Sequence, residues 1–145
     1  MSTDERTSFR LPVRNDADLM TVRQRVRGLS QEQGFGLVQQ TKLVTAASEL
    51  ARNTLIHGGG GSVTVELSTD GDGRTGITLV FSDEGPGIPD IALALRDGYS
   101  TAGGLGMGLS GSKRLVDDFE VETTPGEGTA VTATLWSGPP LNGRR

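Results

Sequence analysis

A carboxylate and an amide lie one helical turn apart in the middle of the chain. Glu49 and Asn53 fall within a segment of helical apolar period that runs from about Leu37 to His57. Their spacing of four residues places both side chains on one face of the expected helix. Asn53 could give its amide oxygen to Mg²⁺, which prefers oxygen ligands, and Glu49 could accept a proton from a hydroxyl group. Taken alone, the pair fits an exposed glutamate and a near-terminal asparagine better.

A second group of chemistry-bearing residues, 83–88 with the sequence DEGPGI, follows an alternating apolar segment that ends near Phe81. The alternation predicts a strand, so Asp83 would lie at a strand end and could point into a pocket. Its carboxylate could accept a hydrogen bond from an adenine amino group, and Gly85 and Gly87 would let the backbone approach the ring closely. The alternative is an ordinary turn, in which Asp and Gly are common.

A third group, residues 103–109 with the sequence GGLGMGL, precedes a segment of helical pattern. Backbone N–H groups at a helix start form an anion site, which here would comprise Gly104, Leu105, Gly106, Met107 and Gly108. The segment lacks the Gly-Lys-Ser/Thr ending of a P-loop, and no strand runs directly into it as in the dinucleotide fingerprint. Residues 98–104 have the composition of a mobile lid. A flexible linker is the alternative, but it would leave the apolar residues among the glycines unexplained.

Apolar periodicity outlines the elements that must position these groups. Strands are expected at residues 9–13, 63–67, 77–81, 119–123 and 131–135, and helices at 19–29, 37–57, 88–95 and 109–118. Pro12 places the first strand at a sheet edge, and Asn15 offers a cap for the first helix. The sequence DGDG at 70–73 predicts a hairpin loop, and four glycines at 58–61 would end the long helix.

The order of these elements favours one fold class. Strands and helices do not alternate regularly, which argues against a doubly wound parallel sheet. Two hairpins, and helices grouped on one side, predict an α/β (α+β) two-layer sandwich whose mixed, mostly antiparallel sheet is covered by helices on one face. We expect a single domain over residues 1–136 and a flexible C-terminal tail at 137–145.

The composition excludes several classes of function. The net charge of −4 argues against a general nucleic-acid binder. No apolar run approaches the roughly 20 residues that span a bilayer, and the polar N-terminus has no signal-peptide core. The absence of cysteine excludes disulfides and thiolate metal sites. We therefore expect a cytoplasmic protein without membrane or nucleic-acid partners.

One arginine cluster and one apolar stripe share the first expected helix. Arg23, Arg25 and Arg27 could form a local basic patch, but a solvated helix face is the favoured interpretation. The stripe, which contains Leu19, Val22 and Val26, could contact a partner but is expected in the core.

Together the three groups resemble, in order and spacing, the N, G1 and G2 boxes of the GHKL ATPase superfamily, which includes histidine kinases, gyrase, Hsp90 and MutL. The resemblance covers about residues 11–136 and implies the Bergerat fold of the histidine-kinase-like ATPases. Gyrase-, Hsp90- and MutL-like proteins would carry large transducer domains, and a histidine kinase needs a phospho-accepting histidine, whereas His57 lies in the expected ATP-site helix. The branch of the superfamily that remains is the small anti-sigma serine kinases. The sequences at 48–53, 98–109, 113–115, 117–119 and 124–129 are similar to the RsbT-type switch kinases of that group.

This resemblance implies roles for individual residues, with ATP and Mg²⁺ as cofactors. Glu49 would be the general base and Asn53 the Mg²⁺ ligand. The adenine would contact Asp83, in a base pocket shaped by Gly85 and Gly87. The remaining implied positions are the phosphate-lid glycines Gly104, Gly106 and Gly108, and Thr129, a strand threonine beside Asp83 and near the adenine.

The resemblance also implies a function. A protein-serine/threonine kinase would transfer the ATP γ-phosphoryl group to a small STAS-domain antagonist, and the freed kinase would activate a PP2C-type phosphatase in a partner switch. The alternative is a nucleotide-binding anti-sigma factor or phosphatase activator that needs no turnover. A monomer or weak homodimer is expected. Related kinases carry a lid arginine, yet Tyr99 to Ser112 contains no Arg or Lys, so Mg²⁺, backbone N–H groups or Lys113 at a distance would stabilise the transferring phosphoryl group.

Overall fold

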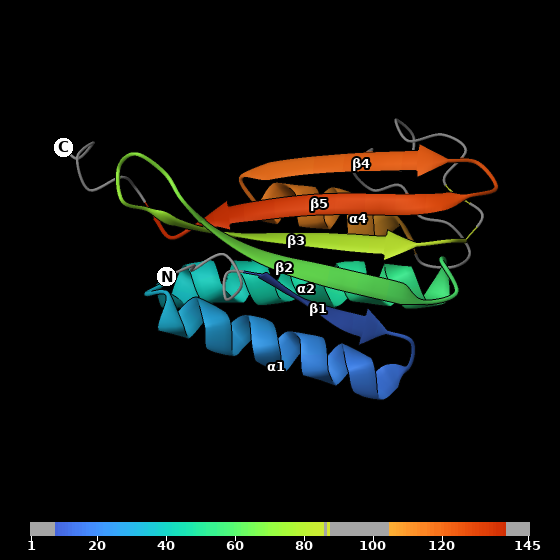
Figure 1. The fold of residues 1–145 in the computed structure, drawn as a ribbon, viewed down its shortest axis with the longest axis horizontal. Helices are drawn as coiled ribbons and strands as arrows, with labels where there is room; N and C mark the ends of the chain where they lie inside the picture. The colour runs from blue at the N-terminus through green and yellow to red at the C-terminus, as the bar shows by residue number, and fades with distance from the viewer. Residues whose placement is uncertain (1–7, 86, 88–104, 139–145) are drawn as a thin grey trace.

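A computed structural model describes residues 8–85, 87 and 105–138 of the chain (Figure 1). It contains the strands β1 (Ser8–Val13), β2 (Gly61–Thr69), β3 (Thr75–Asp83), β4 (Asp118–Thr124) and β5 (Gly128–Trp136), and the helices α1 (Asp16–Glu32), α2 (Leu37–Ile56) and α4 (Leu105–Leu115). The helix expected at 88–95 and the lid expected at 98–104 lie outside the described residues.

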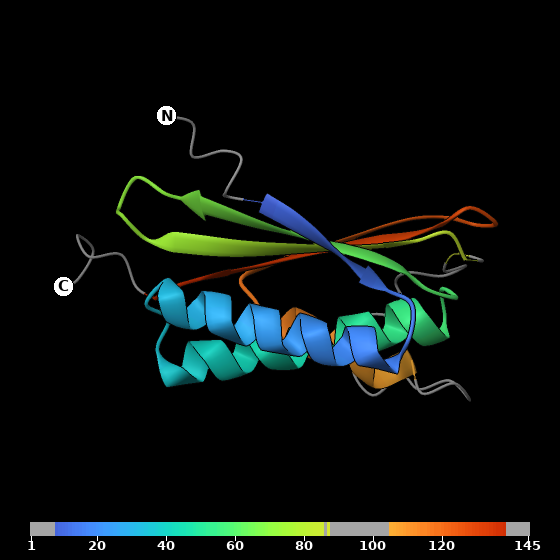
Figure 2. The same cartoon turned by 60° about the horizontal axis from the view of Figure 1, so that its bottom comes forward.

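The five strands form one sheet in the order β1-β2-β3-β5-β4, and each neighbouring pair is antiparallel. Figure 2 shows α1, α2 and α4 on the same side of this sheet. The predicted two-layer sandwich with helices on one face is therefore confirmed, with an antiparallel sheet throughout the described strands. β1, which contains Pro12, is an edge strand as predicted, and residues 70–73 connect the β2–β3 hairpin.

The hydrophobic core fills the space between the sheet and the helices. Alternate residues of the strands point toward the helices, and in the central strand β3 these are the buried Ile77, Leu79 and Phe81. From α1, Val22 and Val26 are fully buried, which confirms their predicted place in the core. The arginines of α1 are exposed, and the guanidinium of Arg25 lies 4.3 Å from the centre of the Phe9 ring. They form a solvated helix face, as favoured from the sequence.

The buried face of α2 differs from the apolar stripe expected from the sequence. Leu37 was expected to begin this stripe, but its side chain is 74% exposed, and Thr41 is exposed as well. Val44 and Ala51 of the expected stripe are buried, and so are Ala46 and Ala47, small residues that the stripe does not include. The full set of buried positions is Leu43, Val44, Ala46, Ala47, Leu50, Ala51 and Thr54. The reason is that α2 packs against α1 on one side and α4 on the other as well as under the sheet, and small residues allow helices to approach closely.

The helix α4 begins four residues earlier than the sequence suggests. It was expected from Leu109 to Asp118, yet it runs from Leu105 to Leu115 and includes part of the glycine-rich segment. Glycine disfavours helix by about 1 kcal/mol per residue, but packing contributes more to helix stability than propensity does. α4 packs along α2, and Leu109 is buried in the core.

A polar cluster fixes the far end of the β2–β3 hairpin. Nε of Arg74 donates to a carboxylate oxygen of Asp70 at 2.6 Å, and this hydrogen bond lowers the pKa of Asp70. The guanidinium of Arg74 also lies 5.0 Å from the centre of the Trp136 ring. Ser137, the first residue of the expected tail, exchanges hydrogen bonds with Thr75. Residues 139–145 of that tail lie outside the described part of the chain.

Replacing Ser112 by alanine is expected to stabilise the fold by about 1 kcal/mol. Ser112 is fully buried in α4, and its hydroxyl has no hydrogen-bond partner in the described part of the protein. The substitution removes an uncompensated desolvation cost and improves helix propensity. Thermal unfolding followed by circular dichroism measures the change. Ser110→Ala is the matched control, since Ser110 is also buried but takes part in an interaction; it should not stabilise. A lower melting temperature for Ser112→Ala would contradict the assignment.

Candidate functional site

A row of three polar side chains crosses the sheet at one end. Asp83 of β3 is the cross-strand partner of Thr129 of β5, and Thr129 is the partner of Thr123 of β4. Asp83 is two residues beyond the buried Phe81, and Thr129 is two residues before the buried Val131. Because alternate residues of a strand point to the same face, the row lies on the helix-covered side. The predicted proximity of Thr129 to Asp83 is therefore observed.

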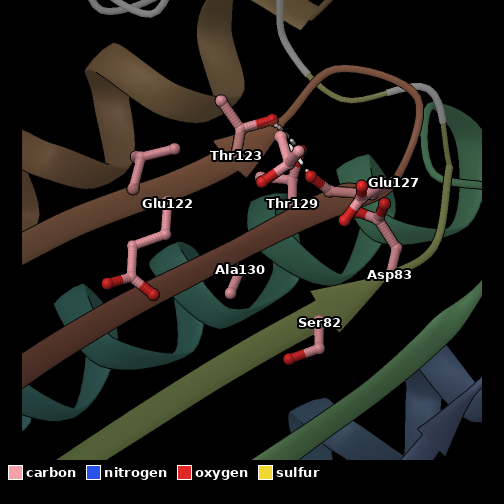
Figure 3. Close-up of a pocket in the computed structure, with 10 residues that line it drawn as sticks. Ser82, Asp83, Glu122, Thr123, Glu127, Thr129 and Ala130 are labelled. Carbon is pink, nitrogen blue, oxygen red and sulfur yellow. Dashed lines mark hydrogen bonds between the residues drawn. The ribbon is translucent and has the colours of Figure 1, made fainter.

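These three residues, together with Ser82, Glu122 and Ala130 from the opposite face of the same strands, line a wide, open recess of about 640 Å³ at the end of the sheet (Figure 3). Asp83 is oriented in it by its own loop. Its Oδ1 accepts a hydrogen bond from the backbone N–H of Gly85 at 2.9 Å. The second oxygen, Oδ2, accepts no hydrogen bond from the described residues.

Glycine backbones close around Asp83. A Cβ atom added to Gly58 would lie 2.3 Å from Cγ of Asp83 and 2.5 Å from Oδ2. At Gly128, with φ +131, it would lie 2.1 Å from the Asp83 carbonyl oxygen, and at Gly85 it would lie 2.8 Å from Cα of Gly58. These positions are restricted to glycine because a side chain would displace the carboxylate or its support. The sequence suggested Gly58 only as a helix terminator.

Gly87 has a different structural role. Its φ of +81° lies in the left-handed region, and an added Cβ would meet the Thr124 carbonyl oxygen at 2.8 Å. The loop after Asp83 thus rests against the turn between β4 and β5. Gly85 and Gly87 were expected to let the backbone approach a ring, and the structure adds that both are needed for backbone packing around Asp83.

The β4–β5 turn holds the other end of the row. The N–H of Glu127 donates to the Thr124 carbonyl at 2.8 Å, and the two central positions are Pro125 and Gly126 at φ +83°, as a type II turn requires. This turn brings Thr123 against Thr129, whose hydroxyl oxygens are 3.0 Å apart. Thr123 was not predicted as a site residue, because only the pairing register reveals it.

The C-terminal end of α2 is joined to Asp83 through Gly58. The carbonyl of Asn53 accepts hydrogen bonds from the N–H groups of His57 at 2.9 Å and Gly58 at 3.2 Å. Gly58 then contacts Asp83, as described above. The helix that carries Glu49 and Asn53 is thereby tied to the sheet end that carries Asp83. Both α2 side chains are half-buried.

The side chain of Asn53 fits a polar ligand. Its Nδ2 is buried and has no hydrogen-bond partner in the described part of the chain. A buried amide normally has a partner, and this one lies a single turn before the Gly58 contact with Asp83. No group of three or more His, Asp or Glu side chains that could hold a metal ion occurs among the described residues. The unpaired NH₂ group can donate to an acceptor such as a phosphate oxygen, whereas a Mg²⁺ ion would be held through the amide oxygen Oδ1 together with phosphates and water.

The predicted phosphate-binding segment is described only in part. Gly104 lies outside the described residues. Leu105, Gly106, Met107 and Gly108 form the first turn of α4. The first four N–H groups of a helix have no partner within it, so this turn has the backbone donors expected of an anion site.

Comparison with known proteins agrees with this arrangement. The family described as histidine kinase-, DNA gyrase B- and HSP90-like ATPases matches residues 38–139. The serine/threonine-protein kinase RsbT of Bacillus subtilis (strain 168) is 45% identical over 119 residues, which cover 82% of this chain and 89% of that protein. The anti-sigma F factor of Thermoanaerobacter sp. (strain X514) is 37% identical over 100 residues, covering 65% of this chain and 68% of that protein.

Solved structures share the fold at low sequence identity. The crystal structure of the RsbU and RsbW domains of a Mycobacterium tuberculosis protein matches with a TM-score of 0.59 and 22% identity, over 91% of this chain and 33% of that one. The SiaB–SiaC complex from Pseudomonas aeruginosa matches with a TM-score of 0.54 and 13% identity, over 89% of this chain and 88% of that one.

The nucleotide-binding fold and the polar row at its sheet end define an ATP-binding domain. The chain belongs to the family of histidine kinase-, DNA gyrase B- and HSP90-like ATPases. The likeness to a serine/threonine-protein kinase over most of the chain confirms the enzyme class expected from the sequence. In the described residues, no helix is long and apolar enough to cross a membrane.

Proposed function

We propose that the chain transfers the γ-phosphoryl group of ATP to a serine or threonine hydroxyl of a small STAS-domain antagonist protein. The observation that carries this proposal is the contact of Gly58 with Asp83, which ties the helix bearing Glu49 and Asn53 to the end of the sheet. A base, a metal ligand and an adenine-binding carboxylate then belong to one site. In this site Asp83 holds the adenine, with Thr129 beside it.

The phosphate end of ATP lies between α2 and the first turn of α4 in this proposal. Asn53 would hold Mg²⁺ through its amide oxygen, together with the phosphates. The bound ion would supply positive charge beside the transferring phosphoryl group. The backbone N–H groups of Leu105, Gly106, Met107 and Gly108 add fixed positive dipoles on the phosphate side.

Glu49 acts as the general base. Its carboxylate accepts the proton of the incoming hydroxyl as the oxygen attacks the γ-phosphorus. Glu49 lies one turn before Asn53 on the same face of α2, so the base and the metal ligand face the same reacting group. Half-burial of Glu49 leaves its carboxylate accessible to a partner's hydroxyl.

The partner switch follows from the charge that is transferred. A phosphorylated residue carries roughly −1.5 to −2 charge, and at an interface with an acidic kinase this addition favours dissociation. The freed kinase then activates a PP2C-type phosphatase or binds a sigma factor. We place this cycle in the cytoplasm, with the kinase as a monomer or weak homodimer.

Phosphate transfer from labelled ATP to a panel of purified STAS-domain proteins from the same genome tests the proposal. The wild-type protein is expected to label at least one of them. Glu49→Ala should lower that transfer by about 10²–10⁴-fold, the usual contribution of a general base, and leave ATP binding intact. Glu32→Ala is the matched control, since Glu32 is an exposed glutamate at the end of α1.

Two other outcomes are informative. If Glu49→Ala transfers phosphate as fast as the wild type, Glu49 is not the base. If the wild type binds ATP but labels no STAS-domain protein, the kinase proposal fails for these partners. The chain would then act as a nucleotide-dependent binding module, in line with its likeness to anti-sigma F factors.

A further inference from the structure

No described helix covers one face of the sheet, which we call the open face (Figure 2). Antiparallel sheets commonly have one face in contact with water, and long charged side chains are the ones most often exposed. In β2, β3 and β5 the open-face side chains are short and uncharged, except for Glu66 and for Trp136, whose ring lies over Gly76. The short ones are Ser62, Thr64, Ser68, Thr78, Val80, Ser82, Ala130, Thr132 and Thr134. The middle of the open face is therefore flat and nearly free of charge.

Opposite charges lie at the two edges of the open face. Leu11 of β1 is buried, so the exposed Arg10 beside it points to the open face. Val121 of β4 packs against the core, so the exposed acidic residues that alternate with it also lie on the open face. These residues are Asp118, Glu120 and Glu122. The open face thus has a basic edge at β1 and an acidic edge at β4.

The strand register places the two kinds of charge in one row. Arg10 pairs with Thr64 of β2, and Thr64 pairs with Val80 of β3. On the other side, Val80 pairs with Thr132 of β5, which pairs with Glu120 of β4. The row therefore has an arginine at one end, a glutamate at the other end and Val80 in its centre.

We propose that the open face binds a second copy of this chain, face to face, about a two-fold axis that runs along β3. This rotation brings Arg10 of each copy opposite Glu120 of the other, and Thr64 of each copy opposite Thr132 of the other. Val80 meets its own counterpart at the axis. A surface that complements itself in this way is what a two-fold homodimer requires. The inference goes beyond the proposed kinase activity and does not depend on it.

The charges select this axis over the alternative one. A two-fold axis that runs across the strands would place β1 over β1 and β4 over β4, so like charges would face each other and repel. The axis along β3 instead brings opposite charges together at both edges. Packed sheets are rotated by about 30° relative to each other, which shifts the facing edge strands by about one or two residues. Arg10 then still lies opposite Glu120 or one of its acidic neighbours on β4.

Arg10 is held over the open face and has donors left for a partner. Its Nε donates to Oγ of Ser62 on the neighbouring strand at 3.1 Å. Its two terminal nitrogens make no ion pair or hydrogen bond with the described residues. Because a guanidinium is weakly hydrated and presents a rigid set of donors, arginine suits ion pairs at interfaces.

The size of the open face fits a weak dimer. The edge strands β1 and β4 are about 19 Å apart at the usual strand spacing, and the nine-residue strands are about 30 Å long. Each copy would contribute roughly 600 Å², somewhat less than the 800 Å² or so per partner of a standard interface. We therefore expect a dimer that dissociates on dilution.

Sedimentation velocity over a series of protein concentrations tests this inference. The wild type is expected to shift from the 15.2 kDa monomer toward twice that mass as its concentration rises, and salt should weaken the association because it screens the exposed edge charges. Arg10→Glu should raise the dissociation constant about tenfold, since two ion pairs per dimer become like-charge contacts. Arg27→Glu is the matched control, because it makes the same change on α1, on the other side of the sheet.

A mixture of two variants shows whether the two charges contact each other. Glu120→Arg alone should weaken the homodimer as Arg10→Glu does. When the two variants are mixed, both edge contacts of a heterodimer join opposite charges, so the heterodimer should form with the affinity of the wild type.

A substitution at the axis probes the centre of the same interface. Val80→Asp would place two carboxylates against each other and should abolish the dimer, whereas Val80→Thr keeps the branched shape and should not. The charge reversals at exposed edge positions keep the inference testable if Val80→Asp does not fold. Circular dichroism confirms that each variant is folded.

Each outcome has a distinct meaning. Weaker homodimers in the single variants and a restored heterodimer support the inference. A wild type that stays monomeric at every concentration overturns it, and so does a dimer whose dissociation constant is the same in Arg10→Glu, Glu120→Arg and Val80→Asp. ATP titration of the same variants separates this failure from a failure of the proposed function. A wild type that dimerises as described but binds no ATP supports the inference and overturns the proposed nucleotide site.

Discussion

Asp83→Asn is expected to weaken ATP binding by about 10- to 100-fold while the protein remains folded. The asparagine side chain can still accept from the Gly85 N–H through its oxygen. It then presents an amide NH₂ where the wild type presents Oδ2, so two donors oppose each other at the adenine amino group. Hydrogen bonds to charged groups contribute about 1.5–3 kcal/mol, which corresponds to the expected loss. Calorimetric titration with ATP measures it.

The matched control for this substitution is Asp72→Asn. Asp72 lies in the β2–β3 hairpin loop, at the end of the strands remote from Asp83. This variant makes the same chemical change and should bind ATP as the wild type does. Equal ATP affinity in Asp83→Asn and Asp72→Asn would remove Asp83 from the site.

Gly58→Ala is expected to abolish measurable ATP binding and to destabilise the fold by about 1–3 kcal/mol, as overpacking does. The new methyl group would lie 2.3 Å from Cγ of Asp83, and the nearest atoms belong to a short side chain held by its own backbone hydrogen bond. Either the carboxylate turns away or the end of α2 moves, and both changes disrupt the site. Thermal unfolding and ATP titration well below the melting temperature measure the two effects separately.

Gly111→Ala is the matched control. Gly111 lies in α4, and an added Cβ would meet no atom within 4 Å. The Gly111→Ala variant should therefore bind ATP as the wild type does, and the substitution should stabilise the helix by about 1 kcal/mol. Destabilisation without loss of ATP affinity in Gly58→Ala would show that the contact supports the fold but not the carboxylate's position.

Local sequence patterns predicted most of the fold. The alternation around Ile77 to Phe81 and the DGDG loop gave the central hairpin, and Pro12 correctly marked an edge strand. The parts of the fold that were predicted wrongly depend on contacts between segments distant in the sequence. Hydropathy favoured Leu37 as a buried residue, but α2 has helices on both sides, so its alanines are buried and Leu37 is exposed. The start of α4 was misplaced for the same reason, because packing on α2 outweighs glycine's low helix propensity.

Some residues of the candidate site could be predicted from the sequence, and others could not. Asp83 and Thr129 could be proposed from their motifs, and their pairing across β3 and β5 places them together. Thr123 and the close packing of Gly58 could not be proposed, since both depend on strand register and on where α2 ends against the sheet. A threonine in a strand and a glycine after a helix are common features, and neither carries a local signal of its partner.

The cluster of Arg74, Gly76 and Trp136 has a practical consequence. Trp136 is the only tryptophan of the chain, and its ring lies against Gly76 and Arg74 at the last residue of β5. Thr129 is seven residues earlier on the same strand, which corresponds to about 23 Å at the usual rise. Intrinsic fluorescence therefore reports the integrity of the sheet from a position remote from the nucleotide. Unfolding curves recorded by tryptophan emission with and without ATP would share their folded baseline, and a shift of the midpoint would measure binding alone.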